Sequence, residues 1–102
     1  MILHNTFRDK LNEGKGTIGT HVLFHDPDIP EMIGDTGLFD YAEYVGEYST
    51  FDMTTLYHIA RSAQCGNLPL MFKLDQEGQG FWAQAALGAG FMAIEITAIQ
   101  AF

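Results

Sequence analysis

The chain has 102 residues, of which 47% are hydrophobic and 18% are charged. This composition is typical of one folded domain and excludes an intrinsically disordered chain. Acidic residues outnumber basic ones by 13 to 5, for a formal net charge of −8. We therefore expect neither a nucleic-acid surface nor an anionic membrane as a partner, because both need clustered Lys and Arg.

The single cysteine, Cys65, allows no internal disulfide, so nothing in the sequence points to an oxidising compartment. We interpret Cys65 as a partly buried structural thiol near a helix end, since no activating base lies close to it in the sequence. Charged residues follow early after the start, which is not typical of a signal peptide. The apolar run 87–94 is too short to span a bilayer. These observations predict a cytoplasmic protein.

Apolar periodicity predicts helices and strands that alternate along the chain. A short helix is predicted to start with the capping-box-like pair Thr6 and Asp9, with Thr6 as the N-cap, and to end at Gly14. Four segments rich in β-branched and apolar residues are predicted strands: 17–24, 39–45, 68–74 and 91–96. Helices are predicted between them, and their apolar positions are Ile29, Met32 and Ile33, then Met53, Leu56, Tyr57 and Ala60, then Phe81, Trp82, Ala85, Ala86 and Ala89. Asp52 or Ser49 is the expected N-cap of the third helix.

This order predicts an α/β domain with parallel strands joined by right-handed crossovers. No linker or composition shift divides the chain, so residues 1–102 are expected to form a single domain. Functional side chains in such folds gather at the carboxyl ends of the strands. Segment 39–52 is therefore the most informative, because a predicted strand runs into an acidic turn with Glu47 and Tyr48 before a helix begins.

Several short motifs together resemble those of a known family in their order and spacing. They are Asn5-Thr6-Phe7, Gly19-Thr20, Asp26-Pro27, 37–41, Gly46-Glu47 and Gly88-Ala89-Gly90. The family is that of the HpcH/HpaI aldolases, metal-dependent lyases of 2-oxo acids built on the phosphoenolpyruvate/pyruvate type of TIM barrel. The resemblance covers nearly the whole chain but only about the first two fifths of such an enzyme.

The resemblance implies parallel βα units that form the first half of a TIM barrel, with about four strands. Residues 1–102 would then be a single partial TIM-barrel domain. A half barrel leaves two strand edges and its inner face uncovered. We therefore expect the chain to complete itself by self-association, as a homo-oligomer.

The resemblance also assigns roles to the acidic turn. In the family the second strand ends in Asp-Gly-Glu-His, where the His is the general acid/base and the Asp orients it. The matching residues here are Val45, Gly46, Glu47 and Tyr48. Glu47 would support a metal-bound water or anchor the turn. Tyr48 occupies the base position, although a phenol with a reference pKa of ~10 is a weak base at neutral pH; hydrogen bonding to a substrate oxygen and a packing role are its alternatives.

Lys73 ends the third predicted strand, where the family has an Arg that binds the pyruvate carboxylate. A lysine supplies the charge without the bidentate geometry, and the alternative is a snorkelling side chain. Glu95 lies inside the fourth predicted strand, where burial is costly unless the carboxylate is paired. It either points into the barrel or marks a strand that is not buried.

The resemblance implies a divalent metal, Mg²⁺ or Mn²⁺, whose two direct ligands in the family lie on later strands, beyond Phe102. We expect no metal ligand in this chain. Its four histidines show no HxH spacing, and the HxxxH pair His21 and His25 lies along a predicted strand, where residues four apart are too distant to share one metal ion.

The function implied is that of an aldolase-like lyase that cleaves a 4-hydroxy-2-oxo acid to pyruvate and an aldehyde. Lys73 would hold the substrate carboxylate, Glu47 would support metal-bound water, and Tyr48 would occupy the base position. Two alternatives stay open: a catalytically inactive barrel fragment that self-associates, and a non-catalytic binder of a small-molecule 2-oxo acid.

Overall fold

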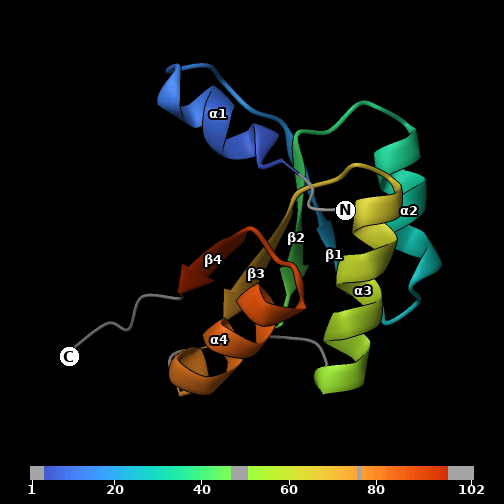
Figure 1. The fold of residues 1–102 in the computed structure, drawn as a ribbon, viewed down its shortest axis with the longest axis vertical. Helices are drawn as coiled ribbons and strands as arrows, with labels where there is room; N and C mark the ends of the chain where they lie inside the picture. The colour runs from blue at the N-terminus through green and yellow to red at the C-terminus, as the bar shows by residue number, and fades with distance from the viewer. Residues whose placement is uncertain (1–3, 47–50, 76, 97–102) are drawn as a thin grey trace.

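The computed structural model describes residues 4–46, 51–75 and 77–96. Helices and strands alternate along these residues, as the sequence predicts (Figure 1): α1 (Thr6–Asn12), β1 (Gly19–Val22), α2 (Asp28–Asp35), β2 (Tyr41–Val45), α3 (Met53–Cys65), β3 (Leu70–Leu74), α4 (Gln79–Ala89) and β4 (Ala93–Ile96). Each strand begins two residues later than its apolar run, at 19, 41, 70 and 93. No helix of the described residues is both long enough and apolar enough to cross a membrane.

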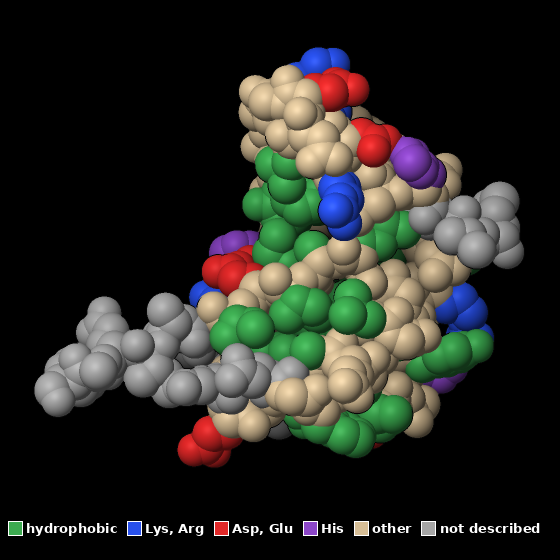
Figure 2. All heavy atoms as spheres, turned by 60° about the vertical axis from the view of Figure 1, so that its left-hand side comes forward, with side chains coloured by type: hydrophobic (Ala, Val, Ile, Leu, Met, Phe, Trp, Pro, Cys, Tyr) green, Lys and Arg blue, Asp and Glu red, His purple; other side chains and the backbone are tan. Residues whose placement is uncertain are grey.

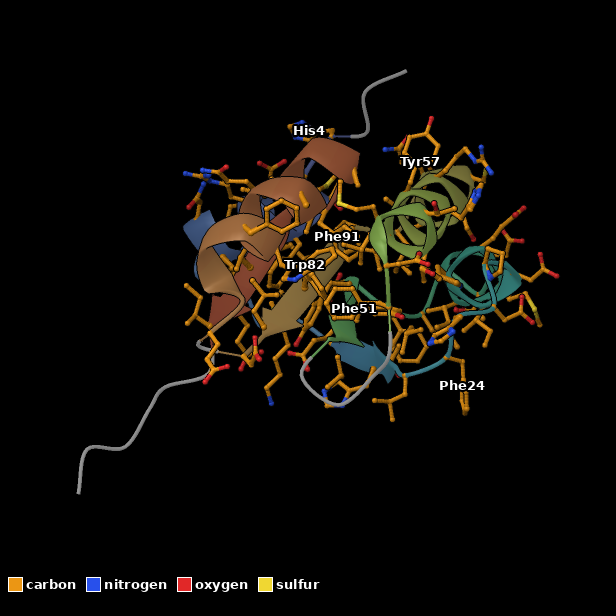
Figure 3. All side chains as sticks on the ribbon, turned by 90° about the horizontal axis from the view of Figure 1, so that it is seen from below. His4, Phe24, Phe51, Tyr57, Trp82 and Phe91 are labelled. Carbon is orange, nitrogen blue, oxygen red and sulfur yellow. The ribbon has the colours of Figure 1, made fainter. Side chains whose placement is uncertain are left out.

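The strands form one parallel sheet in the order β1-β2-β3-β4, so that neighbours in sequence are neighbours in space. Helices α2, α3 and α4 lie along one face of this sheet (Figure 3). The opposite face, which we call the inner face, carries no helix along the described strands. Helix α1 lies at the end where the strands begin (Figure 1), and the Phe7 ring lies 4.5 Å from that of Tyr41. The prediction of parallel βα units is confirmed.

The hydrophobic core lies between the sheet and its helices. Alternation along the strands turns Tyr44 of β2 and Phe72 of β3 toward the helices, and their ring centroids are 5.9 Å apart. Phe51, Trp82 and Phe91 also lie on this side, between the sheet and the helices (Figure 3). The helical part of the core comes from α3, through Leu56, Ile59, Ala60 and Ala63.

Some predicted helix faces are wrong. Met53 and Tyr57 of α3 were expected to be buried, yet they are 54% and 55% exposed. The stripe that faces the sheet is formed by residues 56, 59, 60 and 63 instead, at the i, i+3, i+4, i+7 spacing of one helix face. Phe81 of α4 is 64% exposed because the next residue, Trp82, is the one that packs inward, against Phe51 at 4.7 Å.

Two further expectations need correction. Met32 of α2 is exposed rather than buried. Cys65, the last residue of α3, is also exposed and not partly buried.

The helix ends follow ordinary capping chemistry. Asp52 caps α3, because its side chain accepts a hydrogen bond from the Thr55 backbone N–H at 2.7 Å. At α1 the cap is Asn5 rather than Thr6, and it accepts from the Arg8 N–H at 3.0 Å. Sequence reasoning misplaced this cap by one residue.

The hydroxyl group of Tyr44 destabilises the hydrophobic core. It is buried, and it has no hydrogen-bond partner among the described residues. An unpaired buried hydroxyl destabilises a fold by about 1–3 kcal/mol.

We therefore expect Tyr44→Phe to raise the free energy of unfolding by about 1 kcal/mol, measured by urea denaturation. The control is Tyr57→Phe, because Tyr57 is exposed; a loss of stability in Tyr44→Phe would contradict the expectation.

Candidate active site

The inner face of the sheet carries a histidine, a lysine or a carboxylate from each of its four strands. The register pairs His21 with Glu43 across β1 and β2, and Lys73 with Glu95 across β3 and β4. Glu43 pairs with Met71, two residues before Lys73, so both pairs point to the same face. We call His21, Glu43, Lys73 and Glu95 the inner-face cluster.

Glu43 is the buried member of this cluster, with 6% of its surface exposed. The Nε2 atom of His21 lies 3.3 Å from Glu43 Oε1, within ion-pair distance, and the His21 side chain is 69% exposed. On the other side, the carboxyl group of Glu95 acts on Glu43 through hydrogen bonding and negative charge, and both raise the pKa of Glu43. A hydrogen bond between two carboxyl groups needs one shared proton, since two carboxylates have only acceptors.

These surroundings raise the pKa of Glu43 to about 7. Burial contributes most because it disfavours the charged form, and the hydrogen bond and negative charge of Glu95 act in the same direction. The positive charge of Lys73 lowers the pKa in part. A carboxyl group with a pKa near 7 can both accept and donate a proton at neutral pH.

Of the three predicted site residues, the structure describes Lys73. It is half-buried on the inner face, one residue before β3 ends, and its register partner on β2 is Val45. Glu47 and Tyr48 lie outside the described residues, so their approach to Lys73 stays a prediction.

Gly46 is the last described residue before Glu47 and Tyr48. A Cβ atom at Gly46 would lie 2.2 Å from the ring of Phe72, so only a residue without a side chain fits as the chain leaves β2. The packing of the core therefore dictates the first residue of the acidic turn.

The sequence pointed to Glu95 but not to Glu43. Glu95 was expected to need a partner if buried; it lies exposed on the outer strand β4 and acts on Glu43 through hydrogen bonding and negative charge. Glu43 was missed altogether. The available signal was a carboxylate two residues before the strand end, on the same strand face as Val45 and within a run that is otherwise apolar and aromatic.

The inner-face cluster does not resemble a metal site. Among the described residues, no group of three or more His, Cys, Asp and Glu side chains is placed to hold a metal ion. The donors of this cluster therefore do not fit the divalent metal that the resemblance implies, and such a metal would need ligands outside the described residues.

Two surface hollows lie elsewhere. One, of about 300 Å³, lies between α3 and α4 and is lined by Met53, Leu56, Tyr57, Ala85, Gly88 and Ala89. The other, of about 240 Å³, lies between α2 and α3 and is lined by residues that include Glu31, His58 and Arg61. Both belong to the helical layer, so neither coincides with the inner-face cluster.

No protein-family model and no curated protein sequence matches the chain. Solved structures do match. The citrate synthase SbnG has 20% sequence identity and a TM-score of 0.82, over 94% of this chain and 38% of that chain. A variant of SbnG has 22% identity and a TM-score of 0.72, over 86% and 36% of the two chains. An HpcH/HpaI aldolase from Desulfitobacterium hafniense DCB-2 has 22% identity and a TM-score of 0.70, over 85% and 33%.

These likenesses establish the fold. The chain has the fold of a partial TIM barrel, as the resemblance implied, and it spans well under half the length of the proteins it matches. In a TIM barrel the helices cover the outside of the sheet. The helix-free face with the inner-face cluster thus corresponds to the barrel interior.

The pKa of Glu43 has a consequence for stability. The folded carboxyl keeps its proton up to about pH 7, whereas its ordinary pKa is 4.5. Between these values the folded state binds more protons than the unfolded state, so this group makes stability fall as pH rises, by at most about 1.4 kcal/mol per pH unit. We expect Glu43→Gln to remove this slope between about pH 4.5 and 7, in urea denaturation across that range. Identical slopes in the two proteins would contradict the raised pKa.

Proposed function

We propose that this chain is an aldolase-like lyase domain that cleaves a 4-hydroxy-2-oxo acid to pyruvate and an aldehyde. One observation carries the proposal: within an aldolase-type fold, Lys73 is half-buried on the interior face, one residue from the carboxyl end of β3. Active sites of TIM barrels are built at that end. The matching structures bear the names of an aldolase and a citrate synthase, two kinds of enzyme that make or break carbon–carbon bonds.

Lys73 is the proposed anchor of the substrate. Its ammonium group would bind the carboxylate of the 2-oxo acid as a point charge, which attracts the anion but fixes its orientation less firmly than an Arg fork would. Glu47 would support a metal-bound water beside it. Tyr48 takes the place of the family's His, where its phenol would donate a hydrogen bond to a substrate oxygen. Mg²⁺ or Mn²⁺ would need ligands beyond those of the described residues.

A second candidate function is assembly. β1 and β4 are the outer strands of the described sheet, and outer strands offer unpaired backbone groups to another chain. Figure 2 shows hydrophobic side chains gathered on the face made by α1, β4 and α4. The exposed residues of these elements include Leu11, Phe81, Leu87 and Ile96. A homo-oligomer would cover part of this surface.

A third candidate function is binding of a 2-oxo acid without turnover. Lys73 would then bind the carboxylate of the ligand, as in the lyase proposal.

The lyase proposal predicts pyruvate release from a 4-hydroxy-2-oxo acid in the presence of Mn²⁺ or Mg²⁺, followed with a coupled assay and abolished by EDTA. Lys73→Met should lower kcat/KM by about 10- to 100-fold, because a charged hydrogen bond to the substrate carboxylate is lost. Lys15→Met is the matched control, since Lys15 is an exposed residue whose ion-pair partner is Glu13. Ligand-dependent melting without turnover would favour the binder, and full activity in Lys73→Met would remove Lys73 from the site.

The assembly proposal predicts a particle larger than the 11.3 kDa monomer in analytical ultracentrifugation. Ile96→Lys places a charge at the end of outer strand β4 and should shift the particle toward the monomer. Met32→Lys changes an equally exposed apolar residue on α2 and should have no such effect. A monomeric wild-type chain would contradict the proposal.

A further inference from the structure

The inner-face cluster contains an acid that the family resemblance does not assign. Glu43 is buried beneath the exposed side chains of His21 and Glu95. A hydrogen bond between Glu43 and Glu95 needs a proton on one of the two carboxyl groups. Lys73, the proposed substrate anchor, acts on the same carboxyl group through its charge. A carboxyl that holds a proton beside a cation is an arrangement for proton transfer to a bound anion.

We propose that Glu43 is the acid–base group of the lyase site and that Glu95 is its positioning partner. This inference rests on the proposed function. Glu43 and Lys73 lie on adjacent strands, two residues apart along the same face, which corresponds to about 8 Å between their Cα atoms. A substrate whose carboxylate is bound at Lys73 therefore extends within reach of the Glu43 carboxyl.

The reaction balances with one proton. The Glu43 carboxylate takes the proton from the C4 hydroxyl of the 4-hydroxy-2-oxo acid. The C3–C4 bond then breaks, its electron pair passes into the C2 carbonyl to form the enolate of pyruvate, and C4 leaves as the aldehyde carbon. The protonated Glu43 finally donates the same proton to C3 of the enolate, which gives pyruvate and restores the carboxylate.

The groups around Glu43 are suited to this cycle. The titratable described residues that share its face are His21 from β1, Tyr41 on its own strand, Lys73 from β3 and Glu95 from β4. The Lys73 charge favours the carboxylate that accepts the proton, whereas burial and Glu95 favour the protonated form that returns it. His21 is exposed, so it can move aside for a substrate without disturbing the core.

The first test is Glu43→Gln, which keeps the shape of the side chain and removes its proton transfer. We expect kcat for pyruvate release to fall by about 100-fold or more, with KM changed by less than about threefold. Glu43→Asp should recover part of kcat. Glu13→Gln, a change at an exposed acid outside the inner face, is the control and should leave both parameters unchanged.

The second test uses Glu95→Gln and the pH dependence of kcat/KM. The wild-type rate should rise with pH through a limb near pH 7, because the carboxylate form starts the reaction. Removing the negative charge of Glu95 lowers the pKa of Glu43, so the limb should move to lower pH. Because Glu95 is exposed, we expect Glu95→Gln to fold. It therefore tests the role of Glu43 even if Glu43→Gln does not fold.

The outcomes separate the two proposals. An inactive wild-type chain defeats the lyase proposal, and the role of Glu43 falls with it. An active wild type with an unchanged kcat in Glu43→Gln overturns the role of Glu43 alone, and so does a limb that stays in place in Glu95→Gln. A loss of kcat together with a shifted limb supports the inference.

Discussion

The register between β2 and β3 is the constraint on which the rest of the structure depends. It pairs Tyr44 with Phe72 and Val45 with Lys73. Successive side chains of a strand point to opposite faces, so the first pair joins the core under the helices and the second lies on the inner face. A slip of one residue would turn Lys73 into the apolar core and Phe72 out of it. Apolar burial and placement of the site are thus set by the same hydrogen-bonded ladder.

The two faces of the sheet differ in the polarity of their side chains. The face under the helices is packed with aromatic and aliphatic side chains, and its one unsatisfied polar atom among the described residues is the Tyr44 hydroxyl. The inner face carries two acids, a lysine and a histidine, whose burial in a barrel interior is costly unless they are paired. Glu43 meets this condition through its contacts with His21 and Glu95. Ionisable side chains in such a place are typical of a catalytic or binding site rather than of a packed core.

The sequence predicted the elements and their parallel order because apolar periodicity and turn residues are local signals. The prediction failed where contacts between residues distant in sequence determine which side chains are buried or paired. Met53 and Tyr57 fit an apolar helix stripe, but the packing of α3 selected the stripe through Ile59 and Ala63. Glu43 was overlooked for a similar reason. Its partners come from two other strands, and a pairing between residues 43 and 95 cannot be read from sequence spacing without the register.

The register also shows how the proposed proton transfer can occur in a chain that differs from the resembling enzymes at the turn. Val45 and Tyr48 stand where the resembling enzymes have their Asp and His, so the acid–base pair of the turn is missing. Glu43 precedes Val45 by two residues and therefore points to the same face, one layer deeper in the barrel. Lys73 adjoins both positions through the β2–β3 pairing. A carboxyl at position 43 can thus face a substrate held at Lys73, whereas the same residue at position 42 or 44 would lie in the core.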